Sequence, residues 1–286
     1  MKTLTVVSGK GGTGKTSIVG SFAALTKNSV FADCDVDAAD LSLIMDAQLR
    51  DSRDFIASQK AQIDVGKCIQ CDICEEVCHF DAIRVYRVNR LSCEGCGVCS
   101  LVCPKQAITM EEALSGHLFI SDTPYGPLVH AQLEPGEANS GKLVTLVRQT
   151  AEKIAQETKR ECIIIDGPPG IGCPVIASIT GATAALIVTE PTLSGIRDLT
   201  RVLSVCQHFN VPTFVCINRY DLHEGNTRHM EKFCQEEGIE LVGKIPCDLN
   251  VTHAIVYQIP VVRYAASKAP QQIKMLWNRL AEQAQL

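Results

Sequence analysis

The chain has 286 residues, of which 46% are hydrophobic and 21% are charged, so it can bury the core of one large or two small domains. Its net charge of −5 gives no electrostatic case for nucleic acid as a partner, and no apolar run reaches the ~18 residues of a membrane span. Fifteen cysteines without a recognisable secretion signal lead us to expect reduced, metal-binding thiols in the cytoplasm rather than disulfides.

Short apolar runs rich in β-branched residues alternate with helical stretches along most of the chain. The runs are Leu4–Val7, Val30–Ala32, Cys162–Ile165, Ala184–Val188 and Thr213–Ile217. This alternation predicts an α/β fold with a mostly parallel sheet and helices on both faces. At the C-terminus, the amphipathic stretch Gln271–Leu286 predicts a helix packed on the core.

A glycine-rich segment follows the first apolar run and matches the P-loop pattern G-x-x-x-x-G-K-[S/T]. Such a loop directs backbone N–H groups and a helix N-terminus at phosphates. We expect Lys15 to reach the β- and γ-phosphates and Thr16 to bind Mg²⁺. The residues expected to contact ATP or ADP here are Gly9, Gly11, Gly12, Thr13, Gly14, Lys15, Thr16 and Ser17.

The α/β alternation is interrupted between about Ile63 and Met110, where cysteines become dense. We therefore expect a P-loop ATPase domain formed by residues 1–60 and 113–286, with a small α+β ferredoxin-like domain inserted at 61–112. The insert carries two cysteine runs that repeat with a period of 25 residues. They are Cys68-x-x-Cys71-x-x-Cys74-x-x-x-Cys78 and Cys93-x-x-Cys96-x-x-Cys99-x-x-x-Cys103.

This spacing is typical of bacterial ferredoxins with two [4Fe–4S] clusters, in which the fourth cysteine of each run binds the other cluster. Tetrahedral zinc is the alternative metal, and a purely structural role for both clusters is the alternative function. The crossed pairing predicts two ligand sets: Cys68, Cys71, Cys74 and Cys103 for one cluster, and Cys93, Cys96, Cys99 and Cys78 for the other.

Lys10 places a second lysine in the P-loop, and this loop resembles the deviant P-loop of the MinD/ParA family. That family includes nitrogenase iron protein and the Mrp-type cluster carriers, and the whole chain resembles MinD-superfamily ATPases with an inserted ferredoxin domain. The resemblance implies a homodimer that forms on ATP binding, in which Lys10 reaches the nucleotide of the other subunit. A merely solvated lysine is the alternative.

Two acidic segments match the switches of the same family. The resemblance implies that Asp33 holds the water shell of Mg²⁺ and that Asp35 orients the attacking water. The strand-end sequence that begins at Asp166 resembles Walker B and the second switch, so Asp166 would bind Mg²⁺ through water and Gly170 would place its amide near the γ-phosphate. The implied catalytic residues are Lys10, Lys15, Asp35 and Asp166.

The family also implies that two loops contact the adenine, although an Asn after a strand is common in turns as well. The candidate residues are Asn218, Arg219, Pro246 and Asp248. Cys173 lies where nitrogenase iron protein has a cluster ligand, so two copies could bridge a dimer, or the thiol could simply pack near the switch.

The segment Ser121–Gly141 is rich in Pro, Gly and polar residues, which predicts a long loop. Docking of the insert or of a partner is one role for this loop, and an ordinary surface loop is the alternative.

Three functions fit these observations. The first is an ATP-gated electron carrier that serves an unidentified redox protein. The second is a cluster or metallocofactor assembly factor of the Mrp kind, with a cluster-accepting protein as its partner. The third is a ParA-like positioning switch whose clusters are structural.

Overall fold

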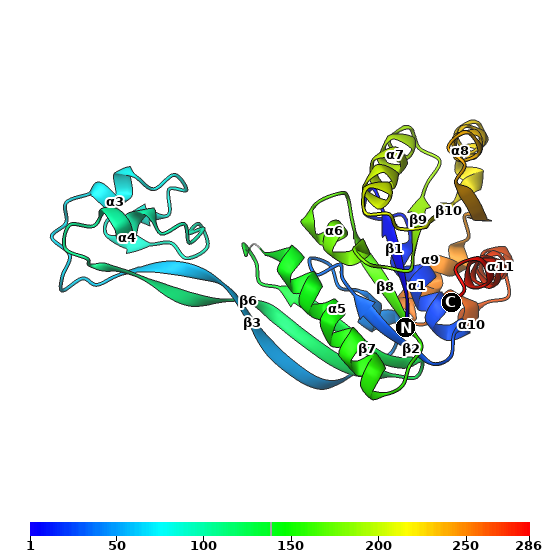
Figure 1. The fold of residues 1–286 in the computed structure, drawn as a ribbon, viewed down its shortest axis with the longest axis horizontal. Helices are drawn as coiled ribbons and strands as arrows, with labels where there is room; N and C mark the ends of the chain where they lie inside the picture. The colour runs from blue at the N-terminus through cyan, green and yellow to red at the C-terminus, as the bar shows by residue number, and fades with distance from the viewer. Residues whose placement is uncertain (138) are drawn as a thin grey trace.

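The centre of the protein, in a computed structural model that describes residues 1–137 and 139–286, is a nine-stranded sheet (Figure 1). Its strands lie in the order β11-β10-β9-β1-β8-β2-β7-β6-β3. Two further short strands, β4 and β5, pair with each other in the insert. The strands are β1 (Lys2–Ser8), β2 (Ser29–Asp33), β3 (Gln48–Ile63), β4 (Ile83–Arg84), β5 (Arg87–Val88), β6 (Ile108–Thr123), β7 (Gly126–Leu133), β8 (Cys162–Pro169), β9 (Ala184–Thr189), β10 (Thr213–Asn218) and β11 (Glu240–Ile245).

Helices connect most of these strands. They are α1 (Lys15–Leu25), α2 (Leu41–Ile44), α3 (Ile73–Glu76), α4 (Val98–Val102), α5 (Ser140–Glu157), α6 (Cys173–Ile179), α7 (Leu193–His208), α8 (Glu224–Glu236), α9 (Leu249–Val256), α10 (Val261–Tyr264) and α11 (Lys268–Gln283), with a 3₁₀ turn at Tyr220–Leu222. Among the described residues, no helix is both long enough and apolar enough to cross a bilayer.

All neighbouring strands from β11 to β7 pair in parallel. Each of the five predicted apolar runs lies within one of these strands, so the predicted mostly parallel sheet is confirmed. Successive side chains of a strand point to opposite faces, and a sheet covered on both faces needs continuous apolar runs. In β8, Ile164 packs in the core with α1 and α11, whereas Ile163 and Ile165 pack in the core with α5. The predicted C-terminal helix is confirmed as α11.

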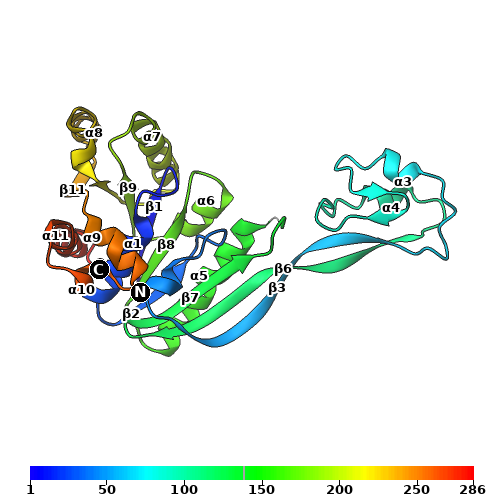
Figure 2. The same cartoon turned by 180° about the vertical axis from the view of Figure 1, so that it is seen from behind.

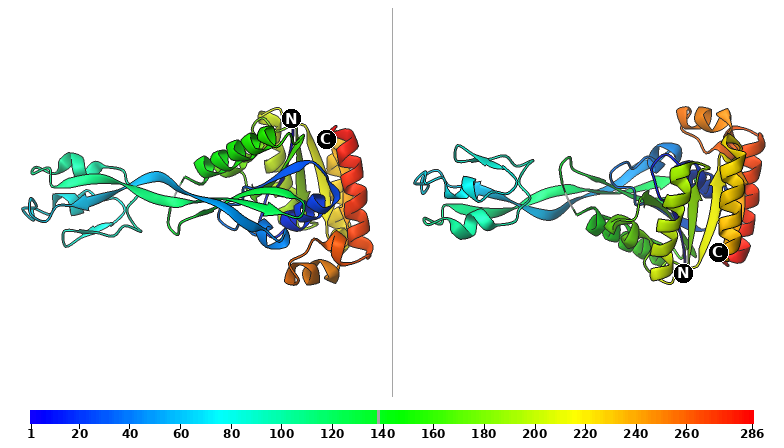
Figure 3. Two further views of the ribbon diagram at one scale, coloured as in Figure 1. Left: turned by 90° about the horizontal axis from the view of Figure 1, so that it is seen from below. Right: turned by 90° about the horizontal axis from the view of Figure 1, so that it is seen from above.

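The edge of the sheet continues into a long arm. Strands β3 and β6 pair antiparallel along their full length, and the far half of this pair projects away from the body with residues 64–107 at its tip (Figures 1 and 2). Views from below and above show the same projecting arm (Figure 3). The expected domain boundaries at 60/61 and 112/113 fall inside these two strands, which belong to the body at one end and to the insert at the other.

The prediction of a long loop at Ser121–Gly141 is wrong for most of its length. Residues up to Thr123 complete β6, and β7 begins at Gly126 after a short turn. Pairing of β7 with both β6 and β2 buries its apolar side chains, which outweighs the turn-forming composition. Residues 134–139 connect β7 to α5, and Ala138 lies outside the described residues.

We predict that Phe22→Ala lowers the free energy of unfolding by about 3–5 kcal/mol, because it removes a fully buried ring from the core. Phe22 packs against Trp277 with ring centroids 4.9 Å apart, and Trp277 is the single tryptophan of the chain. The fluorescence of Trp277 during urea unfolding therefore measures the change in the free energy of unfolding. Met275→Ala, on the exposed side of α11, is the control and should change stability by less than about 0.5 kcal/mol. A similar loss of unfolding free energy in both variants would contradict the placement of Phe22 in the core.

Candidate nucleotide site and cysteine sites

A cavity of about 580 Å³ opens at the carboxyl ends of the parallel strands. Ligands of open α/β sheets bind at this edge, because loops from several strands converge there. The cavity brings together most of the residues predicted to contact nucleotide. Those that line it are Gly11, Gly12, Gly14, Lys15, Thr16, Ser17, Asp35, Asn218, Arg219, Pro246 and Asp248. The predicted residues that do not line it are Gly9, Lys10, Thr13, Asp33, Asp166 and Gly170.

The glycine-rich loop connects β1 directly to α1, as its sequence predicts. Gly14 adopts a left-handed conformation with φ 90°, and a Cβ there would lie 2.5 Å from the Asn218 side-chain nitrogen. Only glycine satisfies both constraints. Lys15 starts α1 and is buried, and its ammonium donates a 2.9 Å hydrogen bond to Ser8 Oγ. An approaching phosphate would compete with this serine for the lysine.

Asp166 is a buried carboxylate at the end of β8. Neither of its oxygens has a hydrogen-bond partner among the described residues, and the side chain is fully buried. Burial raises the pKa of Asp166 to about 7, although the nearby Lys15 ammonium and Thr16 hydroxyl oppose the shift. An orphaned buried carboxylate close to Thr16 fits a hydrated Mg²⁺, which would satisfy its oxygens.

The two acids of the first switch have different surroundings. The Asp33 carboxylate is buried and accepts hydrogen bonds from the backbone N–H groups of Asp35, at 3.1 Å, and Leu41, at 3.0 Å. Burial, and then the neighbouring Asp166, raise the pKa of Asp33 well above its usual value. Asp35 faces the cavity, and its pKa is raised mainly by burial. In this conformation Asp33 therefore organises the loop that positions Asp35.

The backbone of Gly170 is also engaged within the chain. Its N–H donates a 2.8 Å hydrogen bond to the carbonyl of Ser8, with φ at 96°. This amide therefore points at the end of β1, and the second switch has to shift before Gly170 can reach a γ-phosphate.

The two candidate adenine loops show one direct link to the P-loop and one helix cap. The side-chain nitrogen of Asn218 donates a 2.8 Å hydrogen bond to the carbonyl of Thr13, which ties β10 to the P-loop. Asp248 caps α9 by accepting from the N–H of Asn250 at 2.9 Å, and it also accepts from Ser267. Both residues line the cavity, but the Asp248 carboxylate is occupied by these structural contacts.

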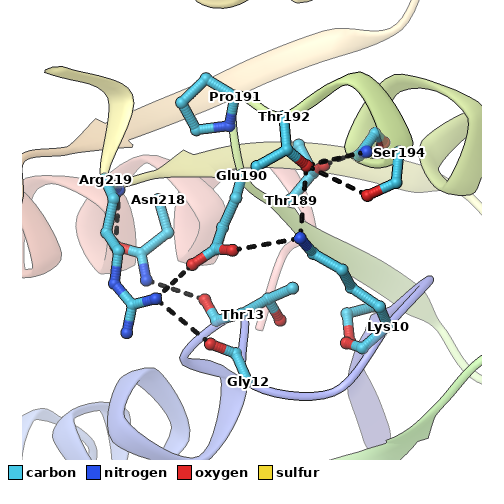
Figure 4. A network of polar contacts seen from close by, with 12 residues as sticks. Lys10, Gly12, Thr13, Thr189, Glu190, Pro191, Thr192, Ser194, Asn218 and Arg219 are labelled. Atoms are coloured by element: carbon cyan, nitrogen blue, oxygen red, sulfur yellow. Dashed lines mark hydrogen bonds and ion pairs between the residues drawn. The ribbon is translucent and has the colours of Figure 1, made fainter. Parts of the chain in front are cut away.

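Glu190 is a site residue that the sequence interpretation missed. Figure 4 shows its carboxylate between Arg219 and the Lys10 ammonium, which lies 3.5 Å away. Lys10 also donates a 3.2 Å hydrogen bond to Thr192, and Arg219 reaches the carbonyl of Gly12 at 3.4 Å. The sequence does contain a signal for Glu190, because it is an acid directly after an apolar strand, the same pattern that indicated Asp166. The structure thus holds Lys10 within its own chain.

The eight cysteines of the insert line two separate cavities. We call the first the distal site, and it is lined by Cys68, Cys71, Cys74 and Cys103. We call the second the proximal site, because its loop contacts the part of β3 nearer the body, and it is lined by Cys78, Cys93, Cys96 and Cys99. Each cavity thus combines three cysteines of one run with the fourth of the other. Apolar side chains, among them Ile73 and Val98, complete the walls.

Backbone amides point at some of these sulfur atoms. Those of Gln70, Ala82 and Ala107 donate to the Sγ atoms of Cys68, Cys78 and Cys103 at 3.3–3.4 Å. All fifteen cysteines of the chain are free thiols. Four thiols in an apolar pocket with N–H donors to sulfur fit the ligand environment of an iron–sulfur cluster.

A P-loop between a parallel strand and a helix, with a buried strand-end carboxylate beside its first helical turn, defines a P-loop nucleotide-binding protein. The family of CobQ/CobB/MinD/ParA nucleotide-binding domains matches residues 4–261, and the chain belongs to this family.

Known relatives support the same assignment. An uncharacterized protein of Methanocaldococcus jannaschii is 34% identical over 282 residues, which cover 98% of this chain and 96% of that protein. The iron-sulfur cluster carrier protein of Pyrococcus abyssi is 31% identical over 136 residues, or 42% of this chain and 46% of its own length. The septum site-determining protein MinD of Pyrococcus horikoshii, solved with Mg-ADP, shares the fold with a TM-score of 0.59 at 18% identity, covering 99% of this chain and 97% of that one.

We predict that Asp166→Asn stabilises the protein at pH 8 when Mg²⁺ and nucleotide are removed with a chelator and by dialysis. An acid whose pKa is higher in the folded state stabilises that state. For Asp166 the stabilisation is complete below the unfolded pKa of 3.8 and is lost as the pH rises through the folded pKa of about 7. The advantage of the variant should therefore grow by roughly 2–3 kcal/mol between pH 5 and pH 8.

Urea unfolding at both pH values measures this difference. Asp37→Asn, an exposed acid of the neighbouring loop, is the matched control. An Asp166→Asn advantage that is the same at pH 5 and pH 8 would show that this carboxyl does not titrate in that range.

Proposed function

We propose that this protein is a Mg²⁺-dependent ATPase that dimerises on ATP binding and carries two [4Fe–4S] clusters, and that nucleotide controls its electron transfer to a redox partner. The observation that carries the proposal is the grouping of eight cysteines into two four-thiol cavities at the tip of an arm of an ATPase sheet. When bound, the clusters would supply reversible one-electron storage.

The chain's own residues divide the remaining work. The P-loop backbone and Lys15 bind the phosphates, while Thr16 and, through water, Asp166 hold Mg²⁺. Asp35 faces the cavity and orients the attacking water, and Asp33 fixes the loop that carries Asp35. Closure of a dimer around two nucleotides would exclude bulk water from the site and leave the attacking water that Asp35 orients.

The direct test is anaerobic purification followed by iron and sulfide counts and electron paramagnetic resonance with and without ATP. We expect about eight iron and eight sulfide per chain, with reduced-cluster signals whose potential or transfer rate responds to ATP. Cluster signals that are indifferent to ATP would rule out nucleotide gating, and a zinc content without iron would rule out the clusters.

A cluster carrier is the second candidate, and the partial similarity to the iron-sulfur cluster carrier protein of Pyrococcus abyssi favours it. Incubation with an apo acceptor protein separates the two functions. A carrier loses cluster to the acceptor, whereas an electron donor keeps its iron.

The crossed ligand sets give a specific prediction. Cys103→Ser should remove the same cluster as Cys68→Ser, because both residues line the distal site, and each should lose about half of the iron. The remaining spectrum should be identical in these two variants and different from that of Cys93→Ser. If Cys103→Ser instead matches Cys93→Ser, each run binds its own cluster.

The position of Lys10 gives another prediction. If Lys10 turns toward the nucleotide of a second subunit, it must first leave Glu190 and Thr192. Glu190→Gln weakens this hold, so we expect a several-fold larger dimer fraction at limiting ATP, and Lys10→Ala should abolish the dimer. Light scattering after size-exclusion chromatography measures both.

The control is Glu224→Gln, which removes an acid from an exposed ion pair on α8. An unchanged dimer in Lys10→Ala would disprove the role in trans.

A further inference from the structure

Lys60 is a buried lysine where the arm meets the insert. Its ammonium donates a 2.8 Å hydrogen bond to the carbonyl of Cys93 and lies 2.8 Å from a carboxylate oxygen of Glu137. The side chains of Lys60 and Glu137 are only 5% and 10% exposed. Because desolvation offsets much of the attraction in a buried ion pair, stability alone does not account for it.

Glu137 ends a short connection that we call the junction loop, residues 134–137. The loop contacts both strands of the arm: the N–H of Glu134 donates to the carbonyl of Ser115 at 3.0 Å, and Ser58 Oγ donates to Glu137 at 2.7 Å. Both front and back views show the chain before α5 pointing toward the insert (Figures 1 and 2).

The arm can bend just on the body side of these contacts. The pairing of β3 with β6 shifts register between Phe55 and Ile56 and again between Ile56 and Ser58. Such bulges bend a strand and interrupt its ladder. A cavity of about 420 Å³ lies beside them, lined by residues of the arm, of the Cys93–Cys96 loop and by Asn139. Glu137 contacts the arm at Ser58 and Lys60, on the insert side of the bulges.

The other side of the junction loop leads to the second switch. Helix α5 starts at Ser140, and α6 starts at Cys173, three residues after Gly170. The two helices are joined closely, since a Cβ on Gly141 would lie 3.2 Å from the Cβ of Cys173. Arg148 of α5 also donates to the last turn of α6, to the carbonyl of Ala177 at 2.6 Å. The helix that follows the second switch is therefore in direct contact with the start of α5.

The start of α5 is linked in turn to the arm. The side-chain nitrogen of Asn139 donates a 3.3 Å hydrogen bond to the carbonyl of Ala57, inside the bulged segment. Contacts thus join α6 to α5, Asn139 at the start of α5 to the arm, and Glu137 through Lys60 to Cys93.

This series ends at one cysteine site. Cys93 belongs to the proximal site, and its neighbour Gly95 is so close to the arm that a Cβ there would lie 2.1 Å from the carbonyl of Gln59. Among the described residues, no hydrogen bond from Lys60 or the junction loop reaches a residue that lines the distal site.

We propose that Lys60 and Glu137 are positioning residues through which the nucleotide site acts on the proximal cysteine site and not on the distal one. The proposal rests on the function proposed above. When the second switch moves, α6 and α5 shift the junction loop, and the Glu137–Lys60 pair displaces the Cys93 loop. The protein environment of the proximal cluster therefore changes when nucleotide binds, whereas the environment of the distal cluster stays the same.

The test is a redox titration of the full-length holoprotein, followed by electron paramagnetic resonance, with and without Mg-ATP. In the unaltered chain, we expect nucleotide to shift the midpoint potential of the cluster that survives in Cys103→Ser, which is the proximal one. Glu137→Gln and Lys60→Met should lose this shift while keeping iron content and ATP affinity. Glu134→Gln, in the same loop but in a half-exposed contact with His117, is the matched control and should keep it.

Either single substitution leaves a buried charge without its partner, which destabilises the fold. The double variant, with Lys60→Met and Glu137→Gln together, removes both charges and avoids this destabilisation. A shift that persists in the double variant, or that appears on the distal cluster, would overturn the proposal.

Hydrogen exchange of the full-length chain as purified provides a readout that does not require a cluster signal. ATP should change exchange in residues 57–62 and 91–95 of the unaltered chain and not in Glu137→Gln. If no iron is incorporated but this exchange response is found, the cluster function fails and the coupling stands. If clusters are present and the exchange response is absent, the coupling fails and the cluster function stands.

Discussion

The parallel pairing of β8 with both β1 and β2 is the constraint on which the rest of the structure depends. Its register sets Asp166 opposite Val6 on one side and opposite Asp33 on the other. The P-loop, the first switch and the second switch therefore leave the sheet at one edge, although the second switch follows the other two by more than a hundred residues in the chain. The same pairing buries Asp166 without a hydrogen-bond partner among the described residues, and this burial raises the pKa of its carboxyl to about 7.

Local patterns predicted much of this arrangement. The apolar runs, the P-loop and the paired cysteine runs depend on short spacings, which a single sequence displays directly. The arm was not predicted, because most of Gln48–Ile63 is exposed and so has no regular burial pattern. Its partner β6 is distant in sequence and is recognised only once the two strands pair. The turn-rich composition of Ser121–Gly141 was misleading for the same reason, since pairing on both sides of β7 outweighs local preference.

The contacts of individual polar side chains were beyond a sequence interpretation. Lys15 with Ser8, Asn218 with Thr13, and Lys10 with Glu190 join strands that lie far apart in the chain. Each occupies a group that the family resemblance assigns to nucleotide. Exchanging one hydrogen bond for another changes the free energy little, whereas leaving a buried group unpaired costs about 1–3 kcal/mol. A nucleotide that offers equivalent partners could therefore replace these contacts at low cost.

The two cysteine runs are nearly equivalent in sequence, and the fold makes them unequal. The repeat of 25 residues predicts two similar cysteine sites, yet one loop lies against β3 with Gly95 at the carbonyl of Gln59 and receives the Lys60 ammonium, while the other lies at the far end of the arm. Two copies of a duplicated sequence become structurally different only where their surroundings differ. Here the buried Lys60–Glu137 pair holds the copy nearer the body, through the carbonyl of Cys93. The physical asymmetry of the insert therefore lies in the arm and the junction loop, outside both cysteine motifs.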